Sequence, residues 1–193
     1  MKYAIIGTGP SAADIHDREL LLKSRTLVVL NGAAAFWPEA TYMVMSEPSA
    51  FHKFVQLAKY PMTLVVTNTA FNHNMARRAR LRIFDTLFYI HSPTLGRLNS
   101  CPTAMEFLHT RHGVTEVELY GIDFGEPGNA IKDNEYGKQG KAAAGLAEQL
   151  GMKVTNCCPS THSQHFPVEG RPWTEGTKAT PPPGTITTVS GQT

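Results

Sequence analysis

A chain of 193 residues, 41% of them hydrophobic, is long enough to bury a full core and has the length of one domain. Its 18 lysines and arginines nearly balance its 16 acidic residues, so the net charge of +2 gives no reason to expect nucleic acid as a partner. The three cysteines, of which Cys157 and Cys158 are adjacent, are typical of reduced thiols in a cytoplasmic protein. The first apolar run stops at Gly7, too early for a signal peptide or a membrane span.

Short apolar and β-branched runs alternate with helical patterns along the chain, as a parallel sheet buried on both faces requires. The predicted strands are Tyr3–Gly7, Thr26–Asn31, Tyr42–Ser46, Thr63–Thr67, Thr86–Ile90, Glu116–Gly121 and Lys153–Asn156. The predicted helices are Ala12–Lys23, Pro48–Lys59, Ala70–Arg80, Pro102–His112 and Lys138–Leu150. This alternation predicts an α/β fold with a single doubly wound, mostly parallel Rossmann-like sheet and helices on both faces.

The composition changes near residue 170. From there the chain is rich in threonine, proline and glycine, includes Pro181-Pro182-Pro183-Gly184 and lacks apolar periodicity. We therefore expect a nucleotide-binding domain over residues 1–170 and a mobile tail over residues 171–193.

Three short turn motifs follow predicted strands. They are Gly7-Thr8-Gly9-Pro10-Ser11, Gly121-Ile122-Asp123-Phe124 and Cys158-Pro159-Ser160. In open α/β sheets ligands bind outside the carboxyl ends of the strands, so these motifs predict one shared site. The residues favour a nucleotide as its ligand.

The glycine turn suggests how a nucleotide would be held. Gly7 and Gly9 allow the backbone to approach a phosphate or ribose, and a helix capped by Ser11 would present free N–H groups. We expect Gly9→Val to abolish binding while the fold survives. Asn31 stands where nicotinamide and flavin proteins place an acidic residue, and its amide can bond a ribose or a base edge. A turn without a ligand and an oxidoreductase remain alternatives.

Taken in order, several segments carry a family resemblance: residues 5–11, 29–32, 46–49, 99–100, 116–124 and 158–160. Over residues 1 to about 165 the chain resembles the bacterial sialyltransferases that use CMP-sialic acid. It is also similar to the hydroxymethylpterin pyrophosphokinase-like family, which shares the Gly-x-Gly-Pro-Ser start and the Gly-x-Asp strand end.

The resemblance implies a transferase that binds a nucleotide or nucleotide-sugar. The implied nucleotide-binding residues are Gly7, Gly9, Pro10, Ser11, Asn31, Ser100, Gly121, Asp123 and Ser160. Thr8 and Glu47 complete the predicted set, although each stands where the sialyltransferases have asparagine.

The chain departs from the sialyltransferases in the segment that follows Phe124. There the family carries phosphate-binding tyrosines and a catalytic histidine, whereas residues 125–137 contain Tyr136 and no histidine. Glycosyl transfer needs a base for the acceptor hydroxyl. His162 and His165, which follow Ser160, are candidate substitutes, and Asp123 is a further catalytic candidate. A structural or exposed role is the alternative for both histidines.

Glu47 matches the acidic position of the pterin-kinase-like family. A carboxylate there could hold Mg²⁺ against a triphosphate, with Asp123 as a second, water-bridged ligand. Mg²⁺-dependent phosphate transfer is therefore one alternative function. A non-catalytic nucleotide-binding protein is the other. The acceptor and any homo-oligomer are left open.

Overall fold

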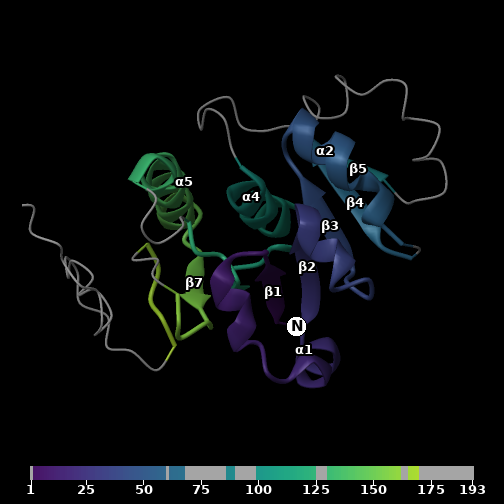
Figure 1. Cartoon of the computed structure of the whole chain (residues 1–193), viewed down its shortest axis with the longest axis horizontal. Helices are drawn as coiled ribbons and strands as arrows, with labels where there is room; N and C mark the ends of the chain where they lie inside the picture. The colour runs from purple at the N-terminus through teal and green to yellow at the C-terminus, as the bar shows by residue number, and fades with distance from the viewer. Residues whose placement is uncertain are drawn as a thin grey trace, which may run out of the picture.

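The computed structural model describes residues 2–59, 61–67, 86–89, 99–124, 130–161 and 165–169 (Figure 1). At the centre is a seven-stranded sheet in which each strand runs parallel to its neighbours, in the order β5-β4-β3-β2-β1-β6-β7. The strands are β1 (Tyr3–Ile6), β2 (Thr26–Leu30), β3 (Tyr42–Met45), β4 (Thr63–Thr67), β5 (Thr86–Tyr89), β6 (Glu116–Tyr120) and β7 (Lys153–Asn156). All seven predicted strands form, and their ends lie within one residue of the prediction.

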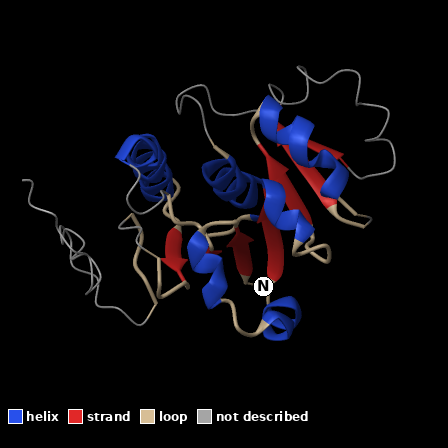
Figure 2. Ribbon diagram, in the orientation of Figure 1, coloured by secondary structure: helices blue, strands red, loops and turns tan. Residues whose placement is uncertain are grey.

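Helices cover both faces of the sheet, which confirms the predicted doubly wound α/β fold; Figure 2 shows the strands flanked by helices. Neighbouring strand residues point to opposite faces, so Ile5 packs into one core and Ile6 into the other. The first face is covered by α4 (Ser100–His112) and α5 (Ala130–Gln149), which lie side by side (Figure 1). The second is covered by α1 (Arg18–Ser24), α2 (Pro48–Phe54) and the 3₁₀ helices η2 (Asn31–Ala35) and η3 (Val55–Leu57).

The first helical segment is broken in two. A 3₁₀ helix, η1 (Pro10–Asp14), ends where Ile15 adopts extended backbone angles, and α1 begins after Asp17. The Asp17 carboxylate accepts the N–H of Leu20 at 2.8 Å, so it caps a new helix. The prediction of one helix over 12–23, capped by Ser11, was therefore wrong.

The other described helices follow the prediction more closely. The predicted helix over 48–59 forms as α2 followed by η3, and α4 begins two residues early because Asn99 caps it. The α5 helix begins at Ala130, eight residues before its predicted start. The predicted helix over 70–80 and the tail over 171–193 lie outside the described residues, so the boundary at residue 170 stays a prediction. Within the described part, no helix combines the length and apolar character needed to cross a membrane.

The order of the strands places the switch point of the sheet between β1 and β6. From β1 the chain proceeds outward to β5, then returns through α4 to form β6 on the other side of β1. The two strands run in register, with Ile6 beside Tyr120. The chain leaves β1 toward one face of the sheet and β6 toward the other, and open α/β sheets bind ligands at such a switch point.

Candidate functional site

The glycine turn after β1 is bonded to the loop after β6. The N–H of Gly7 donates to the Tyr120 carbonyl and that of Gly9 to the Gly121 carbonyl, both at 2.8 Å. A Cβ atom at Gly9 would lie 2.4 Å from Asp123 Oδ2 and 2.8 Å from the Gly121 oxygen. Glycine is favoured here because two loops of the protein meet, and this contact speaks against the expectation that Gly9→Val leaves the fold intact, which stays a prediction.

Asp123 anchors this junction. Its side chain is buried, with Oδ2 accepting the Ser11 N–H at 2.9 Å and Oδ1 accepting the Thr161 hydroxyl at 2.7 Å. Hydrogen bonds to a carboxylate are among the stronger ones in proteins. In η1, the Ser11 N–H thus meets a carboxylate and the Ala12 N–H meets the Gly9 carbonyl. These two N–H groups are engaged within the protein, contrary to the free donors expected there.

The segment after β7 supports the same loop from behind. The buried Cys158 thiol accepts the N–H of Gly121 at 3.3 Å, and the Asn156 amide nitrogen donates to the Ile122 carbonyl at 3.3 Å. Burial raises the pKa of the Cys158 thiol above its usual value. This thiol acts as a buried packing and acceptor group, not as an exposed nucleophile.

Two residues near these loops have backbone angles in the left-handed region, which most residues avoid. Asn31 has φ of +50° and Phe124 has φ of +49°, and they are the two non-glycine residues with positive φ in the described ranges. Asparagine tolerates this left-handed region, but for a bulky residue such as phenylalanine it is strained. Strained backbone of this kind clusters at binding sites.

A chain of hydroxyl groups fixes the Asn31 side chain. Ser100 Oγ donates to Asn31 Oδ1 at 3.2 Å and lies 3.2 Å from the hydroxyl of Ser46, whose N–H also points to it at 3.4 Å. Thr67 on β4 in turn donates to the Ser46 carbonyl at 2.6 Å. The ends of β2, β3 and β4 and the start of α4 are thereby linked.

A second chain of amides links α4 to α5. Asn99 Oδ1 accepts the N–H of Cys101 at 3.2 Å, which caps α4, and Asn99 Nδ2 donates to Gln139 Oε1 at 2.9 Å. Cys101 is buried beside them, and burial raises the pKa of its thiol to about 12, so it stays protonated at neutral pH.

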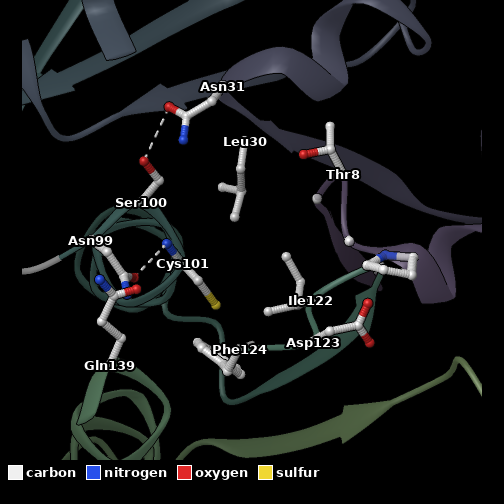
Figure 3. Close-up of a pocket in the computed structure, with 14 residues that line it drawn as sticks. Thr8, Leu30, Asn31, Asn99, Ser100, Cys101, Ile122, Asp123, Phe124 and Gln139 are labelled. Carbon is white, nitrogen blue, oxygen red and sulfur yellow. Dashed lines mark hydrogen bonds between the residues drawn. The ribbon is translucent and has the colours of Figure 1, made fainter. Parts of the chain in front are cut away.

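These groups surround a pocket of about 280 Å³ at the carboxyl ends of β1, β2 and β6 (Figure 3). Its volume lies near the lower end of the range of small-ligand sites. The residues that line it combine amides, hydroxyls and apolar side chains: Gly7, Thr8, Gly9, Pro10, Leu30, Asn31, Asn99, Ser100, Cys101, Gly121, Ile122, Asp123, Phe124 and Gln139.

Eight predicted site residues line this pocket, and others do not. Gly7, Thr8, Gly9, Pro10, Asn31, Ser100, Gly121 and Asp123 line it. Ser11 is buried behind the turn, and Ser160 is exposed with its N–H bonded to Asp14 at 2.6 Å. Glu47 is exposed at the start of α2. The roles assigned to all these residues remain predictions.

Of the two candidate histidines, the structure describes only one. His162 lies outside the described residues. His165 packs edge-on against the Phe124 ring, with 5.8 Å between ring centroids, and against the backbone of Gly140 on α5. Its pKa is lowered by burial and, to a lesser extent, by the charge of Lys141. His165 therefore lies behind a lining residue and is not part of the lining itself.

The two carboxylates proposed for Mg²⁺ are not brought together. Glu47 follows β3 and Asp123 follows β6, with β2 and β1 between these strands. Three strand spacings of about 4.8 Å place them roughly 14 Å apart. In the described ranges no three His, Cys, Asp or Glu side chains gather as a metal site would require.

Six lining residues were not among the predicted site residues: Leu30, Asn99, Cys101, Ile122, Phe124 and Gln139. Asn99 precedes a predicted helix, so its cap position was a usable signal. Phe124 belongs to a predicted motif, but nothing in the sequence signals its positive φ. Gln139 enters the pocket only because α5 packs beside α4, a contact that local patterns do not encode.

No protein-family model and no curated protein sequence matches the chain. Among solved structures it is similar to the sialyltransferase CstII from Campylobacter jejuni in complex with cytidine-5'-monophosphate, at 16% identity over 86% of this chain and 84% of that one, with a TM-score of 0.46. The complex of CstII with CMP-3FNeuAc aligns at 17% identity over 87% and 86%, with a TM-score of 0.46. A point mutant of the alpha-2,3/8-sialyltransferase CstII aligns at 15% identity over 86% of each chain, with a TM-score of 0.47.

Proposed function

We propose that this protein binds a nucleotide or nucleotide-sugar in the pocket between the ends of β1 and β6. The observation that carries the proposal is the position of the pocket at the switch point of a parallel sheet, lined by the glycine turn and by Asn31. Three amide side chains, those of Asn31, Asn99 and Gln139, offer directional hydrogen bonds to a base or ribose. Leu30, Ile122 and Phe124 offer apolar surface to the same ligand.

A transferase of the sialyltransferase-like type is the activity we favour. It is supported by the sequence resemblance, because residues 7–10 of the glycine turn, Asn31 and Ser100 line the same pocket. Of the two candidate histidines, His165 is the one within the described residues; it packs behind Phe124, so a movement of Phe124 would be needed to bring it to the ligand as a base.

A non-catalytic nucleotide-binding protein is the second candidate. The observation that favours it is the engagement of Asp123, whose two oxygens each hold a group of the protein at 2.9 and 2.7 Å. A carboxylate used in this way supports a loop and does not serve as a base. Phosphate transfer with Mg²⁺, as in pterin-kinase-like proteins, would require Glu47 and Asp123 to hold the same metal ion. The two residues follow strands that are three strand spacings apart, which speaks against this alternative.

The first experiment is a thermal-shift and titration panel with CMP, CDP, UDP, GTP, ATP and NAD, each in Mg²⁺ and in EDTA. A ligand that binds the native state raises its stability by mass action. We expect metal-independent binding of a nucleoside monophosphate. Absence of binding by every nucleotide would overturn the proposal, and triphosphate binding lost in EDTA would favour phosphate transfer.

The second experiment separates a transferase from a binding protein. The protein is incubated with CMP-sialic acid and an acceptor sugar, and the release of CMP is followed. Release above the spontaneous rate, reduced in an Asn31→Ala variant, is expected of a transferase. Tight CMP binding without any release would identify a binding protein.

A further inference from the structure

We propose that Ser46 and Ser100 set the direction of the Asn31 amide, so that the pocket selects a ligand atom that only accepts hydrogen bonds. This inference rests on the proposed nucleotide site. It identifies Asn31 as a specificity-determining residue and Ser46 as a positioning residue that does not line the pocket.

The first step is the direction of the hydrogen bonds at Ser100. Its hydroxyl oxygen faces the backbone N–H of Ser46 at 3.4 Å, a group that can only donate. The Ser46 hydroxyl lies 3.2 Å from the same oxygen and can donate to it as well. Ser100 has one proton and donates it to Asn31 Oδ1 at 3.2 Å, so the bond between the two hydroxyls is one that Ser46 donates.

The second step is the hydrogen-bonding group of Asn31 that is left for a ligand. Because Oδ1 is held by Ser100, the amide nitrogen is the polar atom that Asn31 has left for a ligand, and it lies on the side of the ring of lining residues (Figure 3). An amide NH₂ group donates and cannot accept. The ligand atom beside it must therefore be an acceptor, such as a phosphate oxygen or a carbonyl oxygen of a base.

The third step is the rigidity of this arrangement. Ser46 and Ser100 are both buried, and Thr67 of β4 holds the Ser46 carbonyl at 2.6 Å. Asn31 itself is fixed at φ of +50° at the end of β2. Buried hydrogen-bond chains whose members are all satisfied impose one orientation. The donor is thus positioned before the ligand arrives.

The test compares wild type with Asn31→Gly and Asn31→Asp, since all three residues tolerate the left-handed backbone. Binding of CMP, UMP, cytidine and uridine is measured by calorimetry. We expect several-fold weaker binding for Asn31→Gly. We expect a loss of at least about 10-fold for Asn31→Asp, because its carboxylate would face an acceptor atom.

The ligands identify the acceptor. A loss confined to CMP and UMP would place a phosphate oxygen beside Asn31, and an equal loss for the nucleosides would place a base carbonyl there. Asn31→Asp binding as tightly as wild type would mean that the partner is a hydroxyl and would overturn the inference. If wild type binds none of the four and none of the nucleotides in the thermal-shift panel, the proposed function itself fails.

Ser46 is tested through its dependence on Asn31. Ser46→Ala should weaken CMP binding several-fold in the wild-type background, because a lone pair of Ser100 Oγ is then open to the Asn31 amide nitrogen and the amide is free to turn over. In the Asn31→Asp background it should have no effect, since both carboxylate oxygens accept and no direction needs to be set. The control is Ser24→Ala, which deletes an exposed hydroxyl on α1. It should leave CMP binding unchanged in both backgrounds. Equal losses in the two backgrounds would show a merely structural role for Ser46 and contradict the proposal.

Discussion

The Oδ2 atom of Asp123 accepts the backbone N–H of Ser11 at 2.9 Å, although the two residues are 112 positions apart in the sequence. The bond ties the turn after β1 to the loop after β6, the two loops that form the floor of the pocket. The stability of this junction and the shape of the binding site should therefore change together.

Removing the Asp123 carboxylate should destabilise the protein. Asp123→Ala leaves the Ser11 N–H and the Thr161 hydroxyl without this buried acceptor, and we expect the free energy of unfolding to fall by about 2–4 kcal/mol. Asp123→Asn, which retains one acceptor, should cost less. Urea unfolding measures the loss for each of the two variants. An unchanged unfolding free energy for Asp123→Ala would show that the junction does not depend on this residue.

A methyl group at Gly9 should be costly in itself. Its Cβ would lie 2.4 Å from Asp123 Oδ2, so the two loops must separate, and we expect Gly9→Ala to lose about 1–3 kcal/mol of stability before any ligand is added. Gly145 on α5 is the matched control, because nothing lies within 4 Å of its Cβ position. There alanine should stabilise the helix by up to about 1 kcal/mol. The midpoints of thermal unfolding should move in opposite directions, and equal midpoints would refute the assigned contact.

His165 should make the folded state sensitive to mild acid. Its pKa is lowered in the folded protein, mainly by burial, so the unfolded chain binds a proton more readily. The free energy of unfolding is therefore unaffected by protonation of His165 above the ordinary histidine pKa of about 6.5. It declines as the pH falls below about 6.5 toward the lower pKa of His165 in the folded protein. Unfolding curves at pH 7.5 and pH 5.5 should show a larger loss for wild type than for His165→Gln. The same loss in both proteins would place the titrating group elsewhere.

The thiols should react slowly in the native protein. Burial raises the pKa of Cys101 and of Cys157 to about 12 in each case, and Cys158 is also shifted upward by burial. Little thiolate, the reactive form, is therefore present at pH 8. Iodoacetamide labelling followed by mass spectrometry should give slow modification natively and fast modification in urea. Rapid native labelling of Cys101 would mean that the pocket opens more widely than the structure indicates.

The sequence by itself determined the strands, the α/β class and the edge of the sheet where the pocket lies. Buried parallel strands are continuous apolar runs such as Thr26–Leu30, so a local pattern is enough to locate them. Polar turns that follow such runs must gather at one edge, which is why Asn31 and Asp123 were expected at one site.

Only the tertiary structure decided which of these residues meet and what each one does. The pairing of Ser11 with Asp123, the entry of Gln139 into the pocket and the separation of Glu47 from Asp123 all depend on the order β3-β2-β1-β6 and on α5 packing beside α4. Strand order is set by contacts between distant segments, and local periodicity carries no record of them. For the same reason the glycine turn, which any strand-to-helix connection could contain, proved to be shaped by the loop after β6.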